Sequence, residues 1–510
     1  MKRDGTLKSL WQDIQEYKPG NIAVANTVYD VIVVGGGITG VSTALQLQKA
    51  GKQCLLAEAH NLGYGTTGGT TAHLNTLLDI PYNRIEKNFG EDSAQLVAVI
   101  TREAIDLIKR NVDEYNIDCD YSEQPGYLYA ENEEQVKELE EIYEASKRAG
   151  LQVDWANDIP VPYSFIKALV FDRQASIHPT KYLLGIAKAF EDAGGIILQN
   201  SRVVSVDEGD LLTATINNET YQARNLVYAT HIPPGVNLLH FRCAPYRSYA
   251  LALKLNNDDY PQALVYDMQD PFHYFRTHTS NGEKFLVAGG EDHKTGHEEN
   301  TEACFTRLES YCRAHYDVSE VAFKWSSQYF EPTDGLPYIG ELPGHGENMF
   351  VATGFSGNGI TWGTASSIIL TEMIATGNSG EYVELFDPSR IKMVAGFANF
   401  VKESADVVGQ LIGKILPGEK LPSFSDLAHN EARVVKHDGH TLAIYKDPNG
   451  ELHALNAACT HIKCNVAWNN AEQSWDCPCH GSRFSIDGEV LTAPARKDME
   501  VIDLKKGSLI

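Results

Sequence analysis

Val31-Ile32-Val33-Val34-Gly35-Gly36-Gly37-Ile38-Thr39-Gly40 joins a short β-branched run to a cluster of glycines. The β-branched run predicts a buried strand, and the apolar pattern after the glycines predicts a helix. In such a turn Gly35 permits the sharp bend, Gly37 lets the backbone approach a pyrophosphate, and Gly40 lets the helix pack on the strand. The free N–H groups at the helix N-terminus suit phosphates. The stretch therefore predicts a dinucleotide-binding domain.

Two further blocks extend this signal. A second strand is predicted over residues 53–57, and Glu58 follows it, where a carboxylate can accept ribose hydroxyls. Residues 63–71 are too rich in glycine and hydroxyl side chains for an ordinary connector. Residues 334–340 and 351–361 precede an apolar helix predicted to begin near Thr364. Backbone N–H groups and a helix N-terminus there favour negative charge on a ligand.

These blocks, in this order, resemble the FAD-dependent oxidoreductases of the D-amino acid and glycine oxidase superfamily. The resemblance implies FAD rather than NAD, held by a Rossmann-like α/β domain that is interleaved with an antiparallel-sheet substrate domain. It implies cofactor contacts from Gly35, Gly37, Ile38, Thr39, Gly40, Glu58, Ala59, Gly65, Thr66, Thr67, Thr70, Thr71, Val203, Val204, Ala229, Thr230, Asp334, Gly354, Gly357, Asn358, Gly359, Ile360 and Thr361.

The C-terminal segment carries a second kind of site. Cys459-Thr460-His461 and Cys477-Pro478-Cys479-His480 place two thiols and two imidazoles in paired loops. This set predicts a [2Fe–2S] centre with both cysteines on one iron and both histidines on the other. Structural zinc is the alternative, although zinc sites usually pair Cys-x-x-Cys with a distant knuckle, whereas each half-site here mixes Cys and His.

The same segment resembles Rieske proteins of the respiratory and photosynthetic type. The resemblance implies a small all-β domain, the ligands Cys459, His461, Cys477 and His480, and a disulfide between Cys464 and Cys479. It also implies that Ser482 donates a hydrogen bond to a cluster sulfur and that the loop around Pro494 shields the cluster. Phe484 stands where high-potential relatives have a tyrosine, and Lys463 replaces a glycine. We therefore expect a potential in the lower part of the range of roughly −150 to +300 mV.

The expected organisation has four parts. Residues 1–28 form an N-terminal extension, 29–390 the flavoprotein, 391–425 an amphipathic helical linker and 426–510 the Rieske domain. Within the flavoprotein, the nucleotide-binding parts are about 29–80, 173–240 and 331–390, and the substrate-domain parts are about 81–172 and 241–330. The linker prediction rests on apolar residues at three- and four-residue intervals, for which membrane contact is the alternative.

Charge and composition limit the partners. Lys and Arg total 43 and Asp and Glu total 68, so the formal net charge is −25. This balance argues against nucleic acid and anionic membrane surfaces, and it favours a basic redox protein as external electron acceptor. No stretch is apolar enough to span a bilayer and no secretory signal is evident, so we expect a cytoplasmic protein. A Cys464–Cys479 disulfide would be unusual there.

Together the two resemblances predict an enzyme that oxidises a small amine or amino acid at its C–N bond. Hydride transfer to FAD would leave an imine, and electrons would pass singly to the cluster and then to an external acceptor. The candidate substrate-orienting residues are Tyr246, Arg247, Tyr249, His273, Tyr274, Arg276 and His293, with Arg247 or Arg276 pairing with a carboxylate. Two alternatives stay open: an oxidase that uses O₂ and carries a structural or regulatory cluster, and a non-catalytic redox relay or sensor.

Overall fold

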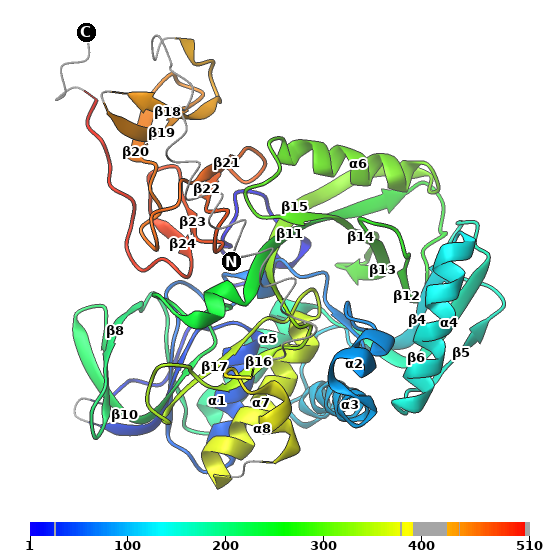
Figure 1. Cartoon of the computed structure of the whole chain (residues 1–510), viewed down its shortest axis with the longest axis horizontal. Helices are drawn as coiled ribbons and strands as arrows, with labels where there is room; N and C mark the ends of the chain where they lie inside the picture. Colours follow the sequence, from blue (N-terminus) through cyan, green and yellow to red (C-terminus); the bar gives the residue numbers. More distant parts are fainter. Residues whose placement is uncertain (25–26, 378–379, 391–425, 438, 505–510) are drawn as a thin grey trace.

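The computed structural model describes residues 1–24, 27–377, 380–390, 426–437 and 439–504. Two large sheets and their helices form the main body, and the C-terminal segment adds two small sheets, one of which lies against it (Figure 1). The linker predicted over 391–425 lies outside the described residues. Within the described residues, no helix has both the length and the apolar composition that crossing a bilayer requires.

The first large sheet has eight strands in the order β16-β17-β10-β1-β2-β7, with β9 pairing to β10 and β8 to β9. Strands β17, β10, β1, β2 and β7 run parallel. The parallel centre and its apolar strands confirm the predicted Rossmann-like α/β fold. The strands are β1 Val28–Val34, β2 Cys54–Ala57, β7 Ile196–Leu198, β8 Val203–Asp207, β9 Leu212–Ile216, β10 Glu219–Tyr228, β16 Tyr338–Glu341 and β17 Met349–Thr353.

Three helices cover this sheet: α1 Ile38–Lys49, α5 Pro179–Asp192 and α7 Gly359–Thr376. Helices α1 and α7 cross closely, because a Cβ atom on Gly363 would lie 2.6 Å from Thr39 Oγ1. Helix α5 begins at Pro179, since proline suits a first helical position and the His178 side chain caps the N-terminus. Helix α7 begins at Gly359, one turn before the predicted Thr364.

The second large sheet has nine strands in the order β15-β11-β14-β13-β12-β4-β6-β3, with β5 pairing to β6. All of its pairings except β12–β4 are antiparallel, as predicted for the substrate domain. The strands are β3 His73–Leu74, β4 Ser122–Ala130, β5 Val153–Ala156, β6 Lys167–Ser176, β11 Cys243–Leu255, β12 Leu264–Tyr266, β13 His273–Ser280, β14 Glu283–Lys294 and β15 Val318–Pro332. The remaining helices are α2 Tyr82–Phe89, α3 Glu91–Glu114, α4 Glu133–Arg148, α6 Thr301–Arg313 and α8 Glu381–Phe386, with short 3₁₀ turns η1 Leu10–Gln12, η2 Thr66–Gly68 and η3 Leu238–Phe241.

The C-terminal segment forms a small all-β unit, as predicted. A three-stranded sheet contains β18 Ala432–His437, β19 His440–Lys446 and β20 Leu452–Asn456. A four-stranded sheet contains β21 Ala467–Asn469, β22 Ser474–Asp476, β23 Arg483–Phe484 and β24 Val490–Thr492. The four-stranded sheet is the one that lies against the main body, and the three-stranded sheet projects away from it (Figure 1). The N-terminal extension packs on the body through the fully buried Trp11, whose Nε1–H donates to the Thr70 carbonyl.

Candidate functional site

A large cavity opens beside the glycine-rich turn after β1. Its empty volume is about 1800 Å³, open solvent at its mouth included. Many of the residues predicted to bind the dinucleotide line it: Gly35, Gly37, Ile38, Thr39, Glu58, Ala59, Gly65, Thr66, Thr67, Thr70, Thr71, Val203, Ala229, Thr230, Gly357, Gly359 and Ile360. Segments that are far apart in the sequence thus meet around one space, and a concave site of this size can enclose a dinucleotide.

Other predicted cofactor residues do not line the cavity: Gly40, Val204, Asp334, Gly354, Asn358 and Thr361. Gly40 supports the turn from behind, because a Cβ atom there would lie 1.8 Å from the Gly35 carbonyl oxygen. Asp334 is held in a buried ion pair with Arg390 at 2.8 Å. Val204 is exposed, because the strand alternation that turns Val203 toward the cavity turns its neighbour outward.

The nucleotide end of the cavity is preorganised by backbone contacts. The Glu58 carboxylate accepts hydrogen bonds from the N–H groups of Gly36 at 2.7 Å and His60 at 2.8 Å. Burial raises the pKa of Glu58. The Ile38 N–H, at the start of α1, donates to Thr67 Oγ1 at 3.0 Å. A helix N-terminus, a close-packed glycine turn and a fixed carboxylate fit the phosphates and ribose of FAD.

The opposite end of the cavity is lined by side chains of the second sheet. Tyr249 and Tyr274, both predicted, lie there beside Ser248 and Tyr329, which were not predicted. Tyr329 donates a hydrogen bond of 2.9 Å to Asp292 Oδ2. Asp292 Oδ1 is buried and has no hydrogen-bond partner among the described residues. Burial raises the pKa of Asp292 to about 7, so this carboxyl group can gain or lose a proton near neutral pH.

The other predicted substrate residues lie away from the cavity. His273 Nδ1 is 2.8 Å from Asp267 and its ring stacks on Tyr311. Arg276 is buried, donates to the Ile177 carbonyl at 3.0 Å and lies over the Trp11 ring. Neither lines the cavity. His273 is on the face of β13 opposite to Tyr274, and Arg276 is on the same face as Tyr274 but two residues further along the strand.

Two more of these candidates act as supports. Tyr246 stacks on Tyr329 with ring centroids 5.7 Å apart. The His293 Nε2 atom is 2.8 Å from the Tyr249 hydroxyl. Tyr246 and His293 do not line the cavity, but the side chains that they contact, Tyr329 and Tyr249, do.

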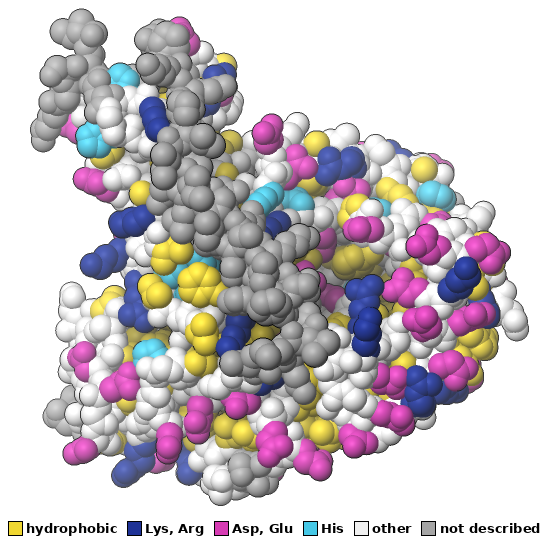
Figure 2. All heavy atoms as spheres, viewed as in Figure 1, with side chains coloured by type: hydrophobic (Ala, Val, Ile, Leu, Met, Phe, Trp, Pro, Cys, Tyr) yellow, Lys and Arg dark blue, Asp and Glu magenta, His cyan; other side chains and the backbone are white. Residues whose placement is uncertain are grey.

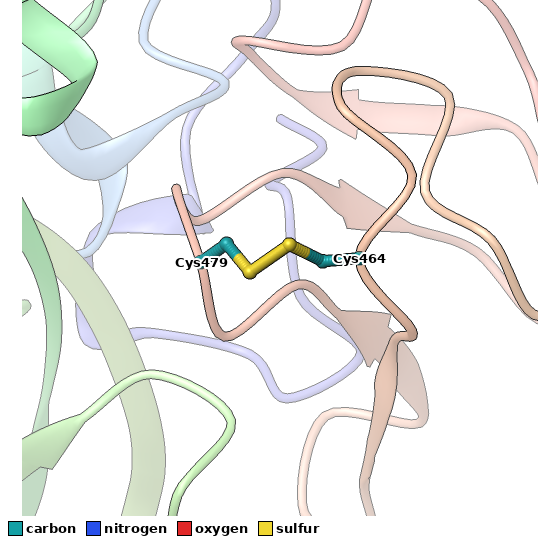
Figure 3. Close-up of a disulfide and its surroundings, with 2 residues drawn as sticks. All are labelled: Cys464 and Cys479. Atoms are coloured by element: carbon teal, nitrogen blue, oxygen red, sulfur yellow. A yellow bond between two sulfur atoms is a disulfide. The ribbon is translucent and has the colours of Figure 1, made fainter. Parts of the chain in front are cut away.

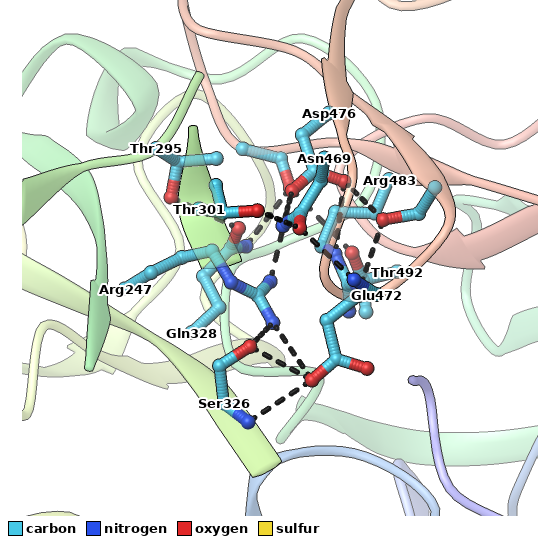
Figure 4. Close-up of polar contacts among 12 residues, drawn as sticks. Arg247, Thr295, Thr301, Ser326, Gln328, Asn469, Glu472, Asp476, Arg483 and Thr492 are labelled. Atoms are coloured by element: carbon cyan, nitrogen blue, oxygen red, sulfur yellow. Dashed lines mark hydrogen bonds and ion pairs between the residues drawn. The ribbon is translucent and has the colours of Figure 1, made fainter. Parts of the chain in front are cut away.

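Arg247 is the clearest departure from expectation, because it belongs to a buried ion cluster between the flavoprotein and the C-terminal unit (Figure 4). Its guanidinium lies 3.7 Å from Glu472 and 3.8 Å from Asp476. The cluster contains three arginines and three carboxylates, none with a side chain more than 2 % exposed: Arg3, Asp4, Arg247, Glu472, Asp476 and Arg483. These charges balance, which is the condition for burying them.

The predicted metal ligands come together in the C-terminal unit. Cys459 and Cys477 are buried, and a hydrogen bond from Cys477 lowers the pKa of Cys459 to about 7, so the two sulfur atoms face each other. The rings of His461 and His480 lie 5.0 Å apart. Cys464 and Cys479 form the predicted disulfide, which links the two ligand loops (Figure 3).

The protonation of the histidines fits metal binding. His461 Nε2 lies 2.9 Å from the Gly235 carbonyl oxygen, and a carbonyl can only accept, so Nε2 carries the proton and Nδ1 keeps its lone pair. The Nδ1 atoms of both His461 and His480 are buried without hydrogen-bond partners among the described residues. A ligating histidine typically donates its other N–H to a carbonyl or carboxylate, so the donor set fits an asymmetric two-Cys, two-His cluster.

The ligand loops contact the flavoprotein directly. Gln328, which lines the cavity, donates from Nε2 to the Gly481 carbonyl at 2.9 Å. A Cβ atom on Gly481 would lie 2.7 Å from Pro245 Cβ, so only glycine allows this approach. The rings of His461 and His240 lie 4.7 Å apart. The histidine side of the cluster site therefore faces the body that holds the cavity.

Sequence reasoning missed several of these residues. Four of these residues belong to no motif, although they lie close in sequence to residues that were predicted: Ser248, Asp292, Gln328 and Tyr329. A partial signal existed for Tyr329, which precedes the Asp334 block on what proves to be a long strand, β15. Nothing in the sequence indicated that Arg496, near the C-terminus, lines the cavity.

The fold and the two sites define a flavoprotein joined to a Rieske iron–sulfur domain. The family described as FAD dependent oxidoreductase matches residues 30–373, and the Rieske [2Fe-2S] domain family matches residues 420–503. The chain is 33% identical over 483 residues to the Rieske 2Fe-2S iron-sulfur protein YhfW of Bacillus subtilis, covering 94% of each chain. It is 25% identical to the gamma-glutamylputrescine oxidoreductase of Escherichia coli, over 70% of this chain and 86% of that one.

Among solved structures, the glycine oxidase from Geobacillus kaustophilus superimposes with a TM-score of 0.59 at 17% identity, covering 71% of this chain and 99% of that one. This protein belongs to the FAD-dependent oxidoreductase family of the D-amino acid oxidase type, and it carries a C-terminal Rieske domain. It is an oxidoreductase with FAD and a [2Fe–2S] cluster as cofactors, as predicted.

Proposed function

We propose that this enzyme oxidises a small amine at its C–N bond and passes the electrons through its own Rieske cluster to an external acceptor. FAD, when bound, accepts a hydride, and the cluster carries electrons one at a time. The observation that carries the proposal is that the cofactor cavity and the cluster-ligand loops meet at one residue, Gln328.

The substrate side of the cavity supports an amine over a free amino acid. Its described lining offers the hydroxyls of Ser248, Tyr274 and Tyr329, with the Asp292 carboxyl group directly behind Tyr329. Of the two candidates for pairing with a substrate carboxylate, Arg247 belongs to the buried ion cluster, and Arg276 does not line the cavity. A carboxylate group beside tyrosines suits a cationic amine, and above its pKa of about 7 Asp292 can take up a substrate proton.

The electron balance defines what the partner must do. The carbon next to nitrogen loses a hydride and the nitrogen loses a proton, which leaves a C=N bond that water cleaves to a carbonyl compound and a free amine. Two electrons leave the protein one at a time, so the acceptor is a one-electron carrier that turns over twice. The net charge of −25 and the acidic side chains spread over the face in Figure 2 support a basic carrier. A cytoplasmic location stays a prediction.

Anaerobic stopped-flow with a matched pair of substrates tests the proposal. Putrescine and ornithine differ only by the α-carboxylate, so the proposal expects putrescine to reduce the flavin and ornithine to do so much more slowly. γ-Glutamylputrescine is included because of the relative in Escherichia coli. Flavin bleaching should precede the appearance of the EPR signal of the reduced cluster.

The outcomes separate the alternatives. Fast reoxidation of the flavin by O₂ with a cluster that stays oxidised would favour an O₂-using oxidase with a structural or regulatory cluster. Flavin that no amine or amino acid reduces would favour a redox relay or sensor. Equal rates with putrescine and ornithine would contradict the preference for amines while leaving the electron route intact.

A further inference from the structure

The Rieske domain contributes a wall to the cavity that binds the dinucleotide. Five residues from β24 and the loop that follows it line that cavity together with the flavoprotein residues: Leu491, Thr492, Ala493, Ala495 and Arg496. Four of them carry small or apolar side chains. Arg496 is the exception, since it is exposed on its own domain and yet faces the cavity.

Backbone contacts fix this loop from both sides. The Gly235 N–H donates to the Pro494 carbonyl at 2.9 Å. On the Rieske side, the Ala495 N–H donates to Ser482 Oγ at 3.1 Å. Ala493 packs against the core of the first sheet. The loop is therefore an ordered part of the cavity wall, because it is hydrogen-bonded both to the flavoprotein and to the loop that follows the cluster ligand His480.

Two guanidinium groups from different domains face this end of the cavity. Arg202, just before β8, donates to the Val490 carbonyl at 3.1 Å, and Arg496 donates to the Pro234 carbonyl at 2.7 Å. Among the described residues neither forms an ion pair within 4 Å. The cavity's two carboxylates are engaged otherwise: Asp4 pairs with Arg483, and Glu58 accepts backbone N–H groups. Arg202 lies close enough to Glu58 to interact with its charge, whereas Arg496 has no carboxylate partner in the cavity lining.

We propose that the Rieske domain completes the FAD site, with Arg496 contacting the anionic ADP half of the cofactor across from Arg202. A guanidinium keeps several N–H donors after one bond to a carbonyl, and a pyrophosphate is an anionic acceptor that those donors of Arg496 can bind. Cofactor binding and docking of the iron–sulfur domain are then coupled, because the same loop serves both.

Binding of FAD to the full-length apoprotein, with its cluster in place, tests this inference. We expect Arg496→Gln to weaken FAD binding about tenfold, equivalent to about 1.4 kcal/mol, as measured by quenching of flavin fluorescence. Lys497→Gln removes a neighbouring positive charge that does not line the cavity, and it should bind FAD as the parent does. Arg202→Gln should weaken FAD binding in the same way from the opposite wall.

Riboflavin, which lacks the ADP half, serves as the internal control for folding. The inference expects riboflavin affinity to be the same in Arg496→Gln as in the parent. Equal FAD affinity in the parent and Arg496→Gln would overturn it, and so would a variant that loses riboflavin and FAD affinity to the same extent. Cluster EPR spectra recorded on each variant report whether the Rieske domain keeps its environment.

Discussion

Gln328 Nε2 lies 2.9 Å from the Gly481 carbonyl oxygen, and this hydrogen bond joins a wall residue of the cofactor cavity to the residue next to His480. Gln328 is almost fully buried, and its Oε1 atom accepts a hydrogen bond from Thr295 at 3.2 Å. Both the nitrogen and the oxygen of the Gln328 amide are therefore fixed by hydrogen bonds. Through this side chain and its hydrogen bond, the cofactor cavity is connected to the loop that carries His480.

Replacing Gln328 by Leu should slow cluster reduction relative to flavin reduction. The substitution keeps the side-chain size but leaves the buried Gly481 carbonyl without this donor, which costs about 1–3 kcal/mol. We expect the ratio of the second stopped-flow phase, cluster reduction, to the first phase to fall about tenfold. Gln262→Leu, at an exposed position before β12, is the control. An unchanged ratio in Gln328→Leu would remove Gln328 from the electron route.

Glu472 holds the Rieske domain on the flavoprotein. Glu472→Gln would leave the guanidinium groups of Arg3 and Arg247 buried with one partner fewer, and removing one member of a buried ion cluster costs about 3–5 kcal/mol. We expect that loss in the free energy of unfolding, measured with denaturant and followed by cluster absorbance. Glu489→Gln, at an exposed position in the same domain, should change it by less than about 0.5 kcal/mol. Similar free energies of unfolding for Glu472→Gln and Glu489→Gln would show that the buried ion cluster contributes little to stability.

Acidification should release the same contact. Burial alone would raise the pKa of Glu472, but the guanidinium groups of Arg3, Arg247 and Arg483 hold that pKa down at about 2. An unfolded glutamate titrates near 4.3, so this carboxylate contributes its stability above about pH 4 and loses it as the pH falls toward 2. The parent should lose about 3 kcal/mol more than Glu472→Gln across this window. Parallel stability curves for the two proteins would contradict this assignment.

Asp292 should set the pH dependence of flavin reduction. Burial raises its pKa to about 7, so the group becomes ionised as the pH rises through neutrality. If the carboxylate form attracts the amine and takes its proton, the rate of flavin reduction should rise through about pH 7. In Asp292→Asn this inflection should disappear, and Asp154→Asn, at an exposed position, should keep it. An inflection that persists in Asp292→Asn would assign it to the substrate or to another group.

Ser482 should raise the potential of the cluster. It is fully buried beside Cys459, and a hydroxyl that bonds to a cluster sulfur favours the reduced state. Ser482→Ala should therefore lower the midpoint potential by about 60 mV, the equivalent of 1.4 kcal/mol for one electron. Ser485→Ala, on the turn before β24, should leave the potential unchanged. Equal potentials for Ser482→Ala and the parent would show that the hydroxyl does not reach the cluster.

Much of the fold and of both cofactor sites was predictable, because the relevant residues stand in short runs. The strand, turn and helix from Val31 onward follow from β-branching, glycine and apolar spacing, and the structure has them nearly as predicted. The disulfide between Cys464 and Cys479 was also predicted from the resemblance to Rieske proteins. The substrate residues were predictable only in part, because strand alternation decides which neighbour faces the cavity. Tyr274 lines the cavity, while its neighbour His273 points to the other face, toward Asp267 and Tyr311. Arg276 shares a face with Tyr274 but lies further along the strand, where it donates to the Ile177 carbonyl.

The two cofactor classes follow from the sequence, since each depends on ligands and glycines held at fixed local spacing by the covalent chain. How the two parts meet depends on the folded chain. Gln328 and Gly481 are 153 residues apart, and Arg496 and Pro234 are 262 apart. Contacts at such separations are made by packing whole sheets and burying balanced charges, so no local pattern encodes them. Arg247 illustrates the physical reason: a buried guanidinium is committed by whichever carboxylates the fold brings to it.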